Sequence, residues 1–560
     1  MNNKEYSDIR EIIFDCAATY PEHNAFIIKN PDMKTYTNIT FKRLKDDIQK
    51  LGTAFLKLGL KDKRIAIIGK NRYEWAVCYY ASVCGVGLVV PLDKGLPEDE
   101  IENSLRLSRA DVIIFEKKYY ETIRGILERK NTSLSTLICM DKIDSECPNY
   151  GDLIRQGEEE LAKGNDSFEK IEIDNKKTSV ILFTSGTTSI AKAVELSHYN
   201  IASNVNGLNR TEKIYDTDTN MAFLPFHHTF GATGLLLFLS NGATTVFCDG
   251  LRYVQKNLKE YHVNVFFCVP LILEAMHKKI IQTIKKQNKT IAVKLAKMVS
   301  KFLLLFKIDI RRKLFQSIID ELGGLRFAIS GAAAIDKKVQ MDFNDFGILT
   351  VSGYGLTETA PVLTCENEDF LRPGSIGKAL YGVDVKIDSP DEEGIGEIIA
   401  KGPNVMNGYY ENEEATKEVL KDGWFHTGDL GYMDKDGFFY IAGRKKNVVV
   451  LKNGKNIYPE EIEILVGRLE YVAENIVFGI PKDDDYTLSA KIVYNKDYMS
   501  EKYPTLSAEE IRNKIWEDIK AINEKLPNYK HIKNIIVTAE PMIKTSTGKV
   551  KRNEEIKQYV

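Results

Sequence analysis

The first part of the chain alternates between helical periodicity and short apolar runs. After Thr40, a good N-cap residue, hydrophobic side chains recur every three or four positions up to Leu58, and Gly59 ends the predicted helix. Three later apolar runs have the composition of strands: 64–68, 87–92 and 111–115. Helical stretches separate them, so the pattern predicts an α/β architecture with helices packed on a sheet.

A loop rich in hydroxyl groups follows the apolar run 180–183, which we expect to be a buried strand. Gly186 lets the backbone approach a ligand closely, and Lys192 adds a cation. These donors predict a polyphosphate site, although a solvated Ser/Thr turn has the same composition. A Walker loop is excluded because Ala191 and Ala193 flank the lysine and an extended segment follows it. The hydroxyl residues are Thr184, Ser185, Thr187, Thr188 and Ser189.

Composition narrows the class of protein. The chain has 560 residues, 43% of them hydrophobic, which is enough for two or more packed domains. Its 77 basic and 79 acidic residues nearly cancel, so nucleic acid is not an expected partner. Residues 1–10 lack a signal-peptide pattern and Asn241 and Gly242 interrupt the stretch 232–248, so we expect a cytoplasmic protein without a membrane span. Eight cysteines without CxxC spacing suit reduced thiols.

Two histidines stand next to each other in FLPFHHTFG, residues 223–231. They lie between a proline turn and an apolar stretch, so we expect one imidazole to face inward. A buried histidine is more often a structural residue than a catalytic one. No nearby carboxylate or cysteine has the spacing of a metal site. Taken alone, the pair is therefore interpreted as structural.

Two further segments combine a strand with residues suited to a nucleotide. FAISGAAAID, residues 327–336, runs from a strand into small residues that allow a flat ring close to the backbone, or that simply form a tight turn. VSGYGLTET, residues 351–359, offers an aromatic ring, a hydroxyl and a carboxylate in Tyr354, Thr357 and Glu358. These groups suit a nucleotide, a phosphate and magnesium, while the alternative is a strand end followed by a helix N-cap at Thr357.

The last quarter of the chain changes character after residue 441. Asp429 lies in a glycine-flanked turn and is either a turn residue or an acceptor for two ribose hydroxyls. A short basic hinge then leads to a helix at 459 and to predicted strands at 475–480 and 488–494. We predict a large, multi-layer α/β N-terminal domain, residues 1–445, and a small α+β C-terminal domain, residues 446–560.

A basic amphipathic segment spans residues 277–313. It carries twelve Lys or Arg residues and a single acid, Asp309, interleaved with hydrophobic residues. Such a segment is commonly a solvated helical face, but the same composition also docks on anionic membranes. Peripheral contact with the inner face of a membrane is therefore left open.

The order of these motifs resembles that of the adenylate-forming ligases, which include acyl-CoA synthetases, luciferases and peptide-synthetase adenylation domains. The resemblance runs from residue 40 to residue 552 and is nearest to bacterial long-chain fatty acid:CoA ligases. It implies that the small C-terminal domain is mobile. The chain departs from the family at Ser189, Ala191 and Ala193, where Gly, Pro and Gly are usual.

The resemblance also implies roles for individual residues. The loop Thr184, Ser185, Gly186, Thr187, Thr188 would bind ATP phosphates together with Lys192, and Thr184 and Glu358 would hold Mg²⁺. Adenine would lie against Gly331, Ala332 and Ala333 and stack on Tyr354, while Thr357 contacts the α-phosphate. His228 would orient the substrate carboxylate, with Phe230, Gly231 and Gly234 flanking an acyl channel. Asp429 and Arg444 would bind ribose, Lys446 would be the hinge, and Lys549 would reach the carboxylate and α-phosphate.

These roles predict an ATP-dependent fatty acid:CoA ligase with ATP, Mg²⁺ and coenzyme A as its small-molecule partners. A nearby alternative is a ligase that loads an acyl carrier protein or activates an aryl or amino acid. A more distant alternative is a degenerate, membrane-associated nucleotide-binding protein, suggested by the substitutions in the phosphate loop.

Overall fold

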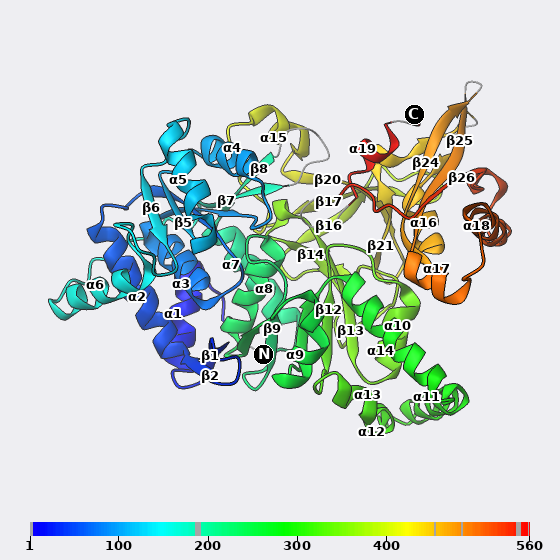
Figure 1. The fold of residues 1–560 in the computed structure, drawn as a ribbon, viewed down its shortest axis with the longest axis horizontal. Coiled ribbons are helices and arrows are strands. Elements are labelled where there is room, and N and C mark those ends of the chain that lie inside the picture. The colour runs from blue at the N-terminus through cyan, green and yellow to red at the C-terminus, as the bar shows by residue number, and fades with distance from the viewer. Residues whose placement is uncertain are drawn as a thin grey trace. The chain divides into compact units, whose positions relative to one another are not determined.

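The computed structural model describes residues 4–184, 192–452, 455–482, 485–544, 550–557 and 559. The chain divides into two compact units (Figure 1). The first contains residues up to 184 together with 192–385 and 400–425, and the second contains 386–399 and the described residues from 426 onward. A large α/β unit and a smaller C-terminal unit are thus present, as the sequence predicts.

A seven-stranded sheet in the first unit follows the order β18-β8-β7-β4-β3-β5-β6. The three strands predicted at 64–68, 87–92 and 111–115 are present and run parallel to one another, and β7 and β8 form an antiparallel pair. The strands are β3 (Lys63–Ile68), β4 (Gly87–Leu92), β5 (Val112–Phe115), β6 (Thr136–Cys139), β7 (Thr178–Thr184), β8 (Lys192–Ser197) and β18 (Gly408–Tyr409). Both faces of β5 are buried, as expected for a parallel strand between helical layers.

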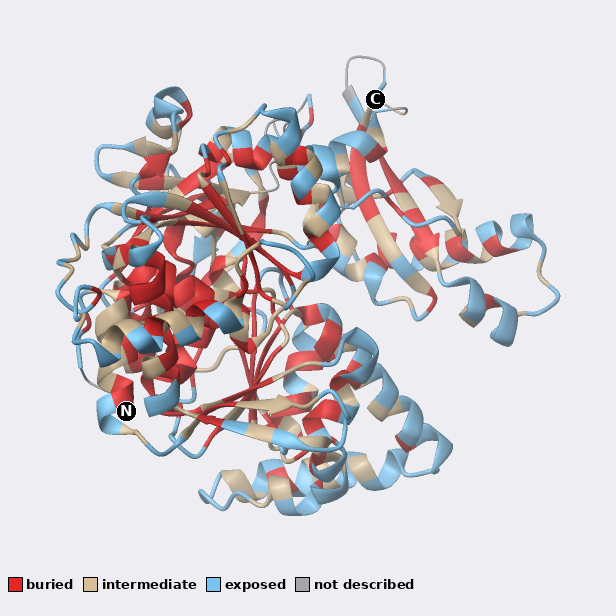
Figure 2. Ribbon diagram, turned by 60° about the vertical axis from the view of Figure 1, so that its left-hand side comes forward, coloured by how far each residue is buried: buried red, intermediate tan, exposed pale blue. Residues whose placement is uncertain are grey.

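A second, nine-stranded sheet has the order β15-β14-β13-β12-β11-β9-β10-β1-β2. Its members are β1 (Asn24–Lys29), β2 (Tyr36–Thr40), β9 (Thr219–Ala222), β10 (Thr244–Phe247), β11 (Val265–Cys268), β12 (Phe327–Ser330), β13 (Leu349–Gly355), β14 (Val362–Cys365) and β15 (Lys378–Ala379). Strands β9, β11, β12 and β13 are parallel neighbours, so their carboxyl ends share one edge. Figure 2 shows the buried strands in red beneath helices with pale blue outer faces.

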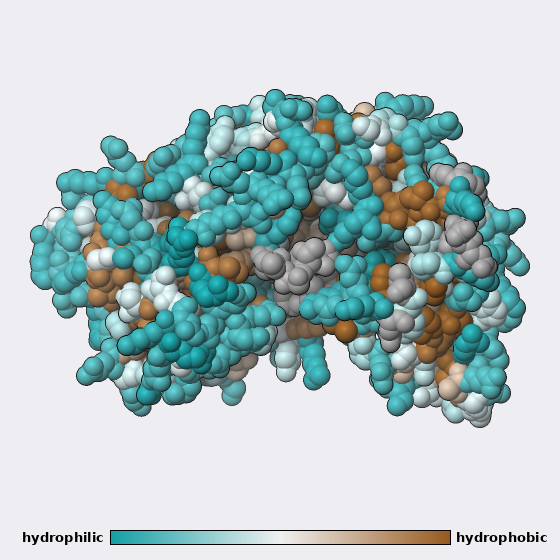
Figure 3. Space-filling model, turned by 90° about the horizontal axis from the view of Figure 1, so that it is seen from above, coloured by the Kyte–Doolittle hydropathy of each residue, from teal (hydrophilic) through white to brown (hydrophobic). Residues whose placement is uncertain are grey.

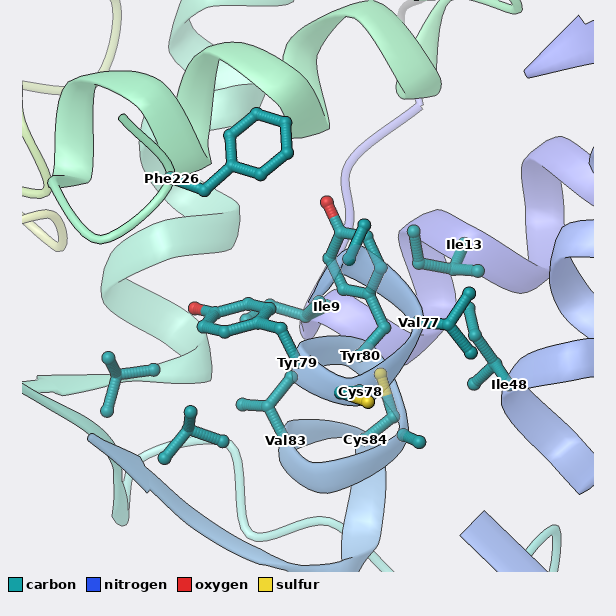
Figure 4. Packing of buried hydrophobic residues seen from close by; sticks show 14 of the residues in the cluster. Ile9, Ile13, Ile48, Val77, Cys78, Tyr79, Tyr80, Val83, Cys84 and Phe226 are labelled. Atoms are coloured by element: carbon teal, nitrogen blue, oxygen red, sulfur yellow. The ribbon is translucent and has the colours of Figure 1, made fainter. Parts of the chain in front are cut away.

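Helices of the first unit join these sheets through a shared core. Thr40 caps α2 (Phe41–Lys57) by accepting from the Arg43 N–H, as the sequence predicts. Helices α1 (Ile9–Thr19) and α3 (Tyr73–Ala81) pack with α2, and Figure 4 shows side chains of these helices packed together, with Phe226 on a separate segment of the same cluster. Tyr80 is 1% exposed, so an aromatic ring fills the middle of this packing. Other helices of the first unit are α4 (Glu98–Ser108), α5 (Tyr120–Arg129), α6 (Tyr150–Ala162), α7 (His198–Thr211) and α8 (Thr229–Ser240).

The second unit has its own sheet and its own hydrophobic core. Strands β24 (Val472–Lys482), β25 (Asp485–Tyr494) and β26 (Asn534–Thr538) pack with α16 (Pro459–Gly467) and α18 (Ala508–Asn523). Ser507 and Glu510 form the predicted capping box at the start of α18. Strands β20 (Trp424–Met433) and β21 (Phe439–Arg444) pair so that Asp429 lies opposite Arg444.

The basic segment predicted at 277–313 is helical. It comprises most of α10 (Pro270–Lys286), all of α11 (Thr290–Leu304) and the short α12 (Arg311–Leu314). Nearby α14 (Lys337–Asp345) contacts both α10 and α11. Within the described part of the chain, no helix combines the length and the apolar character needed to cross a bilayer.

Candidate active site

Several predicted site residues follow the carboxyl ends of neighbouring strands. Gly331 comes directly after β12, and Thr357 and Glu358 follow β13. Because β12 and β13 run in parallel with Ser330 opposite Ser352, these segments leave the sheet at the same edge. Open α/β sheets bind ligands at this edge. The topology therefore brings together the segments expected to bind the nucleotide.

Tyr409 connects two predicted site residues of opposite charge. Its hydroxyl donates a hydrogen bond to Glu358 Oε1 at 2.8 Å. The Lys192 ammonium lies 4.6 Å from the centre of its ring, within the range of a cation–π contact. Burial, together with the Glu358 carboxylate, raises the pKa of Tyr409 well above its usual value, so the hydroxyl keeps its proton and remains a donor. Tyr409 thus joins the start of β8 to the segment after β13.

Backbone contacts fix the position of the Glu358 segment. The segment forms a short 3₁₀ helix, Thr357–Thr359, instead of the α-helix considered from the sequence. The Met406 N–H donates to the Glu358 carbonyl at 2.8 Å, and Asn404 Nδ2 donates to the Thr359 carbonyl at 2.9 Å. Both donors precede Tyr409 in the same stretch of chain. Strand β18 and the residues just before it therefore hold both the side-chain carboxylate and the backbone carbonyl of Glu358.

Thr184 and Lys192 face each other where β7 and β8 meet. They are paired in the antiparallel register, and Thr184 Oγ1 donates to the Lys192 carbonyl at 3.2 Å. The structure thus places the two ends of the predicted phosphate loop side by side. The loop residues between them, Ser185, Gly186, Thr187 and Thr188, lie outside the described residues, as does Lys549.

Gly331 lies close to an aromatic ring of the protein. A Cβ atom at Gly331 would lie 2.8 Å from the Phe230 ring, so the missing side chain leaves room for this phenyl group. Ala332 has φ of 69° and is exposed, as is Ala333. The backbone here is left-handed, a conformation that costs energy outside glycine. Tyr354 is 8% exposed within β13, so its ring is largely enclosed by protein.

His228 belongs to a cluster with His227 and Asp93. The two imidazoles lie 4.3 Å apart, and His227 Nε2 is 3.5 Å from Asp93 Oδ1. His227 is the buried partner and His228 is half-buried at the N-cap of α8, which agrees with one inward-facing ring. Asp93 follows β4, more than a hundred positions earlier, so local spacing gave no sign of this carboxylate.

A narrow apolar cavity lies between β9, α8 and β11. It includes the three residues expected along an acyl channel, Phe230, Gly231 and Gly234. Its volume is about 10 Å³, which is room for about one water molecule. An added Cβ at Gly231 would lie 2.2 Å from the Pro225 carbonyl oxygen, and one at Gly234 would lie 2.8 Å from the Phe267 ring. Backbone and an aromatic ring occupy the space that these glycines leave.

The second unit holds a separate polar cluster. Arg444 Nε lies 2.7 Å from Asp429 Oδ1, and the Asp429 side chain is 6% exposed. Burial, with the neighbouring Arg444, lowers the pKa of Lys446. Glu397 accepts from Lys445 at 3.0 Å and from the Gly428 N–H at 3.0 Å. Within this unit, the predicted ribose-binding and hinge residues are therefore neighbours.

The fold of the whole chain is that of known acid-activating enzymes. An anthranilate CoA ligase, solved in complex with anthranoyl-AMP, superposes with a TM-score of 0.77, covering 100% of this chain and 99% of that one. The two sequences are 21% identical, so this likeness concerns the fold alone. It confirms the predicted fold class.

A family profile described as AMP-binding enzyme matches residues 13–410, and one described as AMP-binding enzyme C-terminal domain matches residues 446–560. The chain therefore belongs to the AMP-binding enzyme family, the adenylate-forming class that its motifs predict.

Relatives in this family have different named substrates. Fatty acyl-CoA synthetase B of Dictyostelium discoideum is 28% identical over 489 residues, covering 80% of this chain and 71% of that protein. A probable 4-coumarate–CoA ligase of the same organism is 29% identical over 545 residues, covering 92% and 90%. A long-chain-fatty-acid–[acyl-carrier-protein] ligase of Arabidopsis thaliana is 24% identical over 639 residues, covering 100% and 86%.

Proposed function

We propose that this enzyme is an ATP-dependent fatty acid:CoA ligase that works in two steps. In the first, the acid's carboxylate attacks the α-phosphorus of ATP, the bond from that phosphorus to the bridging oxygen breaks, and acyl-adenylate and pyrophosphate form. In the second, the thiol of coenzyme A attacks the acyl carbon, its proton is lost, and AMP leaves. Family membership and the fatty acid relatives support this proposal.

The contact of Tyr409 with both Lys192 and Glu358 carries the proposal. Transfer at the α-phosphorus develops negative charge on phosphoryl oxygens, and preorganised charges stabilise it. Lys192 supplies a cation at the start of β8, and Tyr409 limits where that ammonium lies. The same tyrosine orients Glu358 through its hydroxyl, so one residue positions both charged groups.

Magnesium fits the donor groups proposed for it. Thr184 offers a hydroxyl oxygen and Glu358 a carboxylate, which are the hard oxygen ligands that Mg²⁺ prefers. Bound there, the ion would neutralise charge on the ATP phosphates. The protein's own part is to hold the Glu358 side chain, which Tyr409 does, and to fix its backbone, which Met406 does.

The apolar cavity supports a hydrocarbon substrate. Aromatic and aliphatic side chains dominate its lining. Since its present volume is about that of one water, an acyl chain would have to displace an aromatic ring, and Phe230 and Phe267 are the rings nearest the glycines. We assign the cavity to the acyl chain and His228, at the N-cap of α8, to the carboxylate end.

Free thiols support a reducing, cytoplasmic setting for this activity. All eight cysteines are free, and six of them are buried. Burial raises the pKa of Cys139 to about 11, so this thiol stays protonated and unreactive near neutral pH.

An AMP-release assay over a panel of acids tests the function. We expect turnover with medium and long saturated acids and poor reaction of short acids, with release of AMP and acyl-CoA dependent on coenzyme A. Lys192→Met should abolish most of this activity, while Lys61→Met, an exposed lysine elsewhere in the chain, should not. Faster turnover of acetate, 4-coumarate or an amino acid would contradict the substrate. Transfer to an acyl carrier protein in preference to coenzyme A would contradict the acceptor.

A further inference from the structure

Helix α11 packs on the first unit through one face. Val293, Ala296 and the buried Ser300 occupy this face, and the first two pack against a small core formed by Ile284, Phe315 and Phe346. Lys297 also points this way, since its ammonium lies over the Phe346 ring at 4.4 Å and pairs with Asp342. The inward face is therefore fully accounted for by intramolecular contacts.

The opposite face of α11 and the turn after it are hydrophobic and exposed. At 100° per residue, Ile291, Leu295, Met298 and Phe302 fall about half a turn away from Val293 and Ser300. Ile291 is 75% exposed and Leu305 is 78% exposed. The Phe302 and Phe306 rings lie 5.3 Å apart and face solvent as a pair. We call this surface the docking face: Ile291, Leu295, Met298, Phe302, Leu305 and Phe306.

The docking face is larger than the isolated exposed hydrophobic side chains found on most proteins. Hydrophobic groups are scattered over a largely hydrophilic surface in Figure 3, and isolated exposed side chains of this kind are common. Contiguous apolar patches are different, because they mark sites of interaction. The docking face places six large apolar side chains within 16 consecutive residues.

Cations lie along one border of the docking face and beyond its end. Lys294 and Lys301 fall on the same side of it on α11, and Lys307 and Lys313 follow it in the chain, all of them exposed. In the described part of the chain, Lys294 and Lys307 have no salt-bridge partner. The surrounding segment 277–313 contains twelve basic residues and one acidic residue. The preferred partner is therefore both apolar and negatively charged.

We propose that the docking face inserts into the surface of an anionic lipid bilayer. An amphipathic helix with large apolar side chains on one face and lysines at its borders lies in the plane of the interface. With 15 residues, α11 spans about 22 Å, which is too short to cross a hydrocarbon core of roughly 30 Å. A second copy of the chain fits less well, because pairing two such faces would bring their lysines together.

Vesicle flotation of the full chain tests this proposal. We expect it to float with vesicles containing about one-third phosphatidylglycerol and to remain unbound with pure phosphatidylcholine. Salt should weaken the binding, since screening shortens the reach of the lysines from about 10 Å at 0.1 M to about 3 Å at 1 M. Equal binding to both vesicle types would overturn the proposal.

Two sets of variants separate the apolar and the electrostatic parts. Phe302→Ser with Phe306→Ser should lower the bound fraction at limiting lipid by about tenfold or more, because two aromatic insertions are lost. Met33→Ser with Leu251→Ser is the matched control, since both side chains are exposed elsewhere, and should bind like the parent. Circular dichroism checks folding in each case.

The charge variants do not depend on the apolar ones folding. Lys294→Gln with Lys307→Gln should lower binding to anionic vesicles several-fold, whereas Lys61→Gln with Lys130→Gln, both exposed outside the segment, should not. Unchanged binding in both test pairs would overturn the proposal. So would a lipid-independent dimer that the Phe302 and Phe306 changes disperse, because the occupant would then be a second copy.

Discussion

Tyr409 illustrates how a neutral residue controls two charged ones. Its ring lies beneath the Lys192 ammonium and its hydroxyl donates to Glu358, so both charges are held at defined positions without pairing directly. A direct salt bridge would leave less charge available to a ligand. The arrangement would keep the cation and the carboxylate separately available for the phosphate and the metal that we propose they bind.

Tyr409→Phe should isolate the role of this hydroxyl. The ring beneath Lys192 remains, but the hydrogen bond to Glu358 is lost, and such bonds to charged groups are worth about 1.5–3 kcal/mol. We expect adenylation to fall by roughly ten- to a hundredfold. Pyrophosphate release measures this step. Tyr410→Phe is the control, since that hydroxyl contacts Arg64 and Glu411, and its adenylation rate should stay near the parent rate.

Glu212 should make the protein less stable as pH rises. Burial raises the pKa of this fully enclosed carboxyl to about 8. Between its ordinary pKa of 4.5 and that value, the folded state binds the proton and the unfolded state does not, so the free energy of unfolding falls with increasing pH. Glu212→Gln removes this dependence, at roughly 1.4 kcal/mol per pKa unit.

We therefore expect denaturant titrations to show little gain for Glu212→Gln near about pH 4.5 and the largest gain above about pH 8. Glu414→Gln, at an exposed position, should change stability little at either pH. A loss of stability that is equal at all pH values would show that Glu212 is not protonated in the folded protein.

Elements formed by local signals were predicted well from sequence. The capped helix after Thr40, strand β4 and the Ser507 capping box depend on neighbouring residues and are present. Tyr409 and Asp93 were missed because their partners, Glu358 and His227, lie 51 and 134 positions away. Only the pairing of β18 with β8 and the packing around α8 bring these residues together. The roles of all the proposed site residues remain predictions, and Ser185–Thr188 and Lys549 also lie outside the described residues.

Strand β11 and helix α8 together should set acyl chain length. Phe267 fills the space beside Gly234, so Phe267→Ala should enlarge the cavity and raise kcat/KM for longer acids relative to shorter ones. The cost in stability is about 3–5 kcal/mol. Phe266→Ala is the matched control, because successive strand residues face opposite sides and Phe266 packs in another core. It should lose similar stability without altering the chain-length profile.

On the scale of the whole molecule, the proposed site residues belong to two units with separate cores. The first contains Lys192, Glu358 and Tyr409, and the second contains Asp429, Arg444 and Lys446. The two family profiles also divide, ending at 410 and beginning at 446. The two proposed half-reactions use different partners for the acid, ATP in the first and coenzyme A in the second. We propose that the second unit changes position between these two half-reactions.

Variants at Lys549 and Lys446 should separate the two half-reactions. Lys549→Ala removes the ammonium proposed to hold the substrate carboxylate and α-phosphate, so adenylation should fall on the order of a hundredfold or more. Thioester formation from synthetic acyl-adenylate and coenzyme A should continue near the parent rate, because that step requires no phosphoryl transfer.

Lys446→Pro fixes φ at the proposed hinge and should show the reverse defect, with adenylation kept and thioester formation lost. Lys445→Gln, beside the hinge, is the control for local charge. Equal loss of both half-reactions in Lys549→Ala would contradict the two-conformation mechanism, since a lysine used in one conformation affects one step.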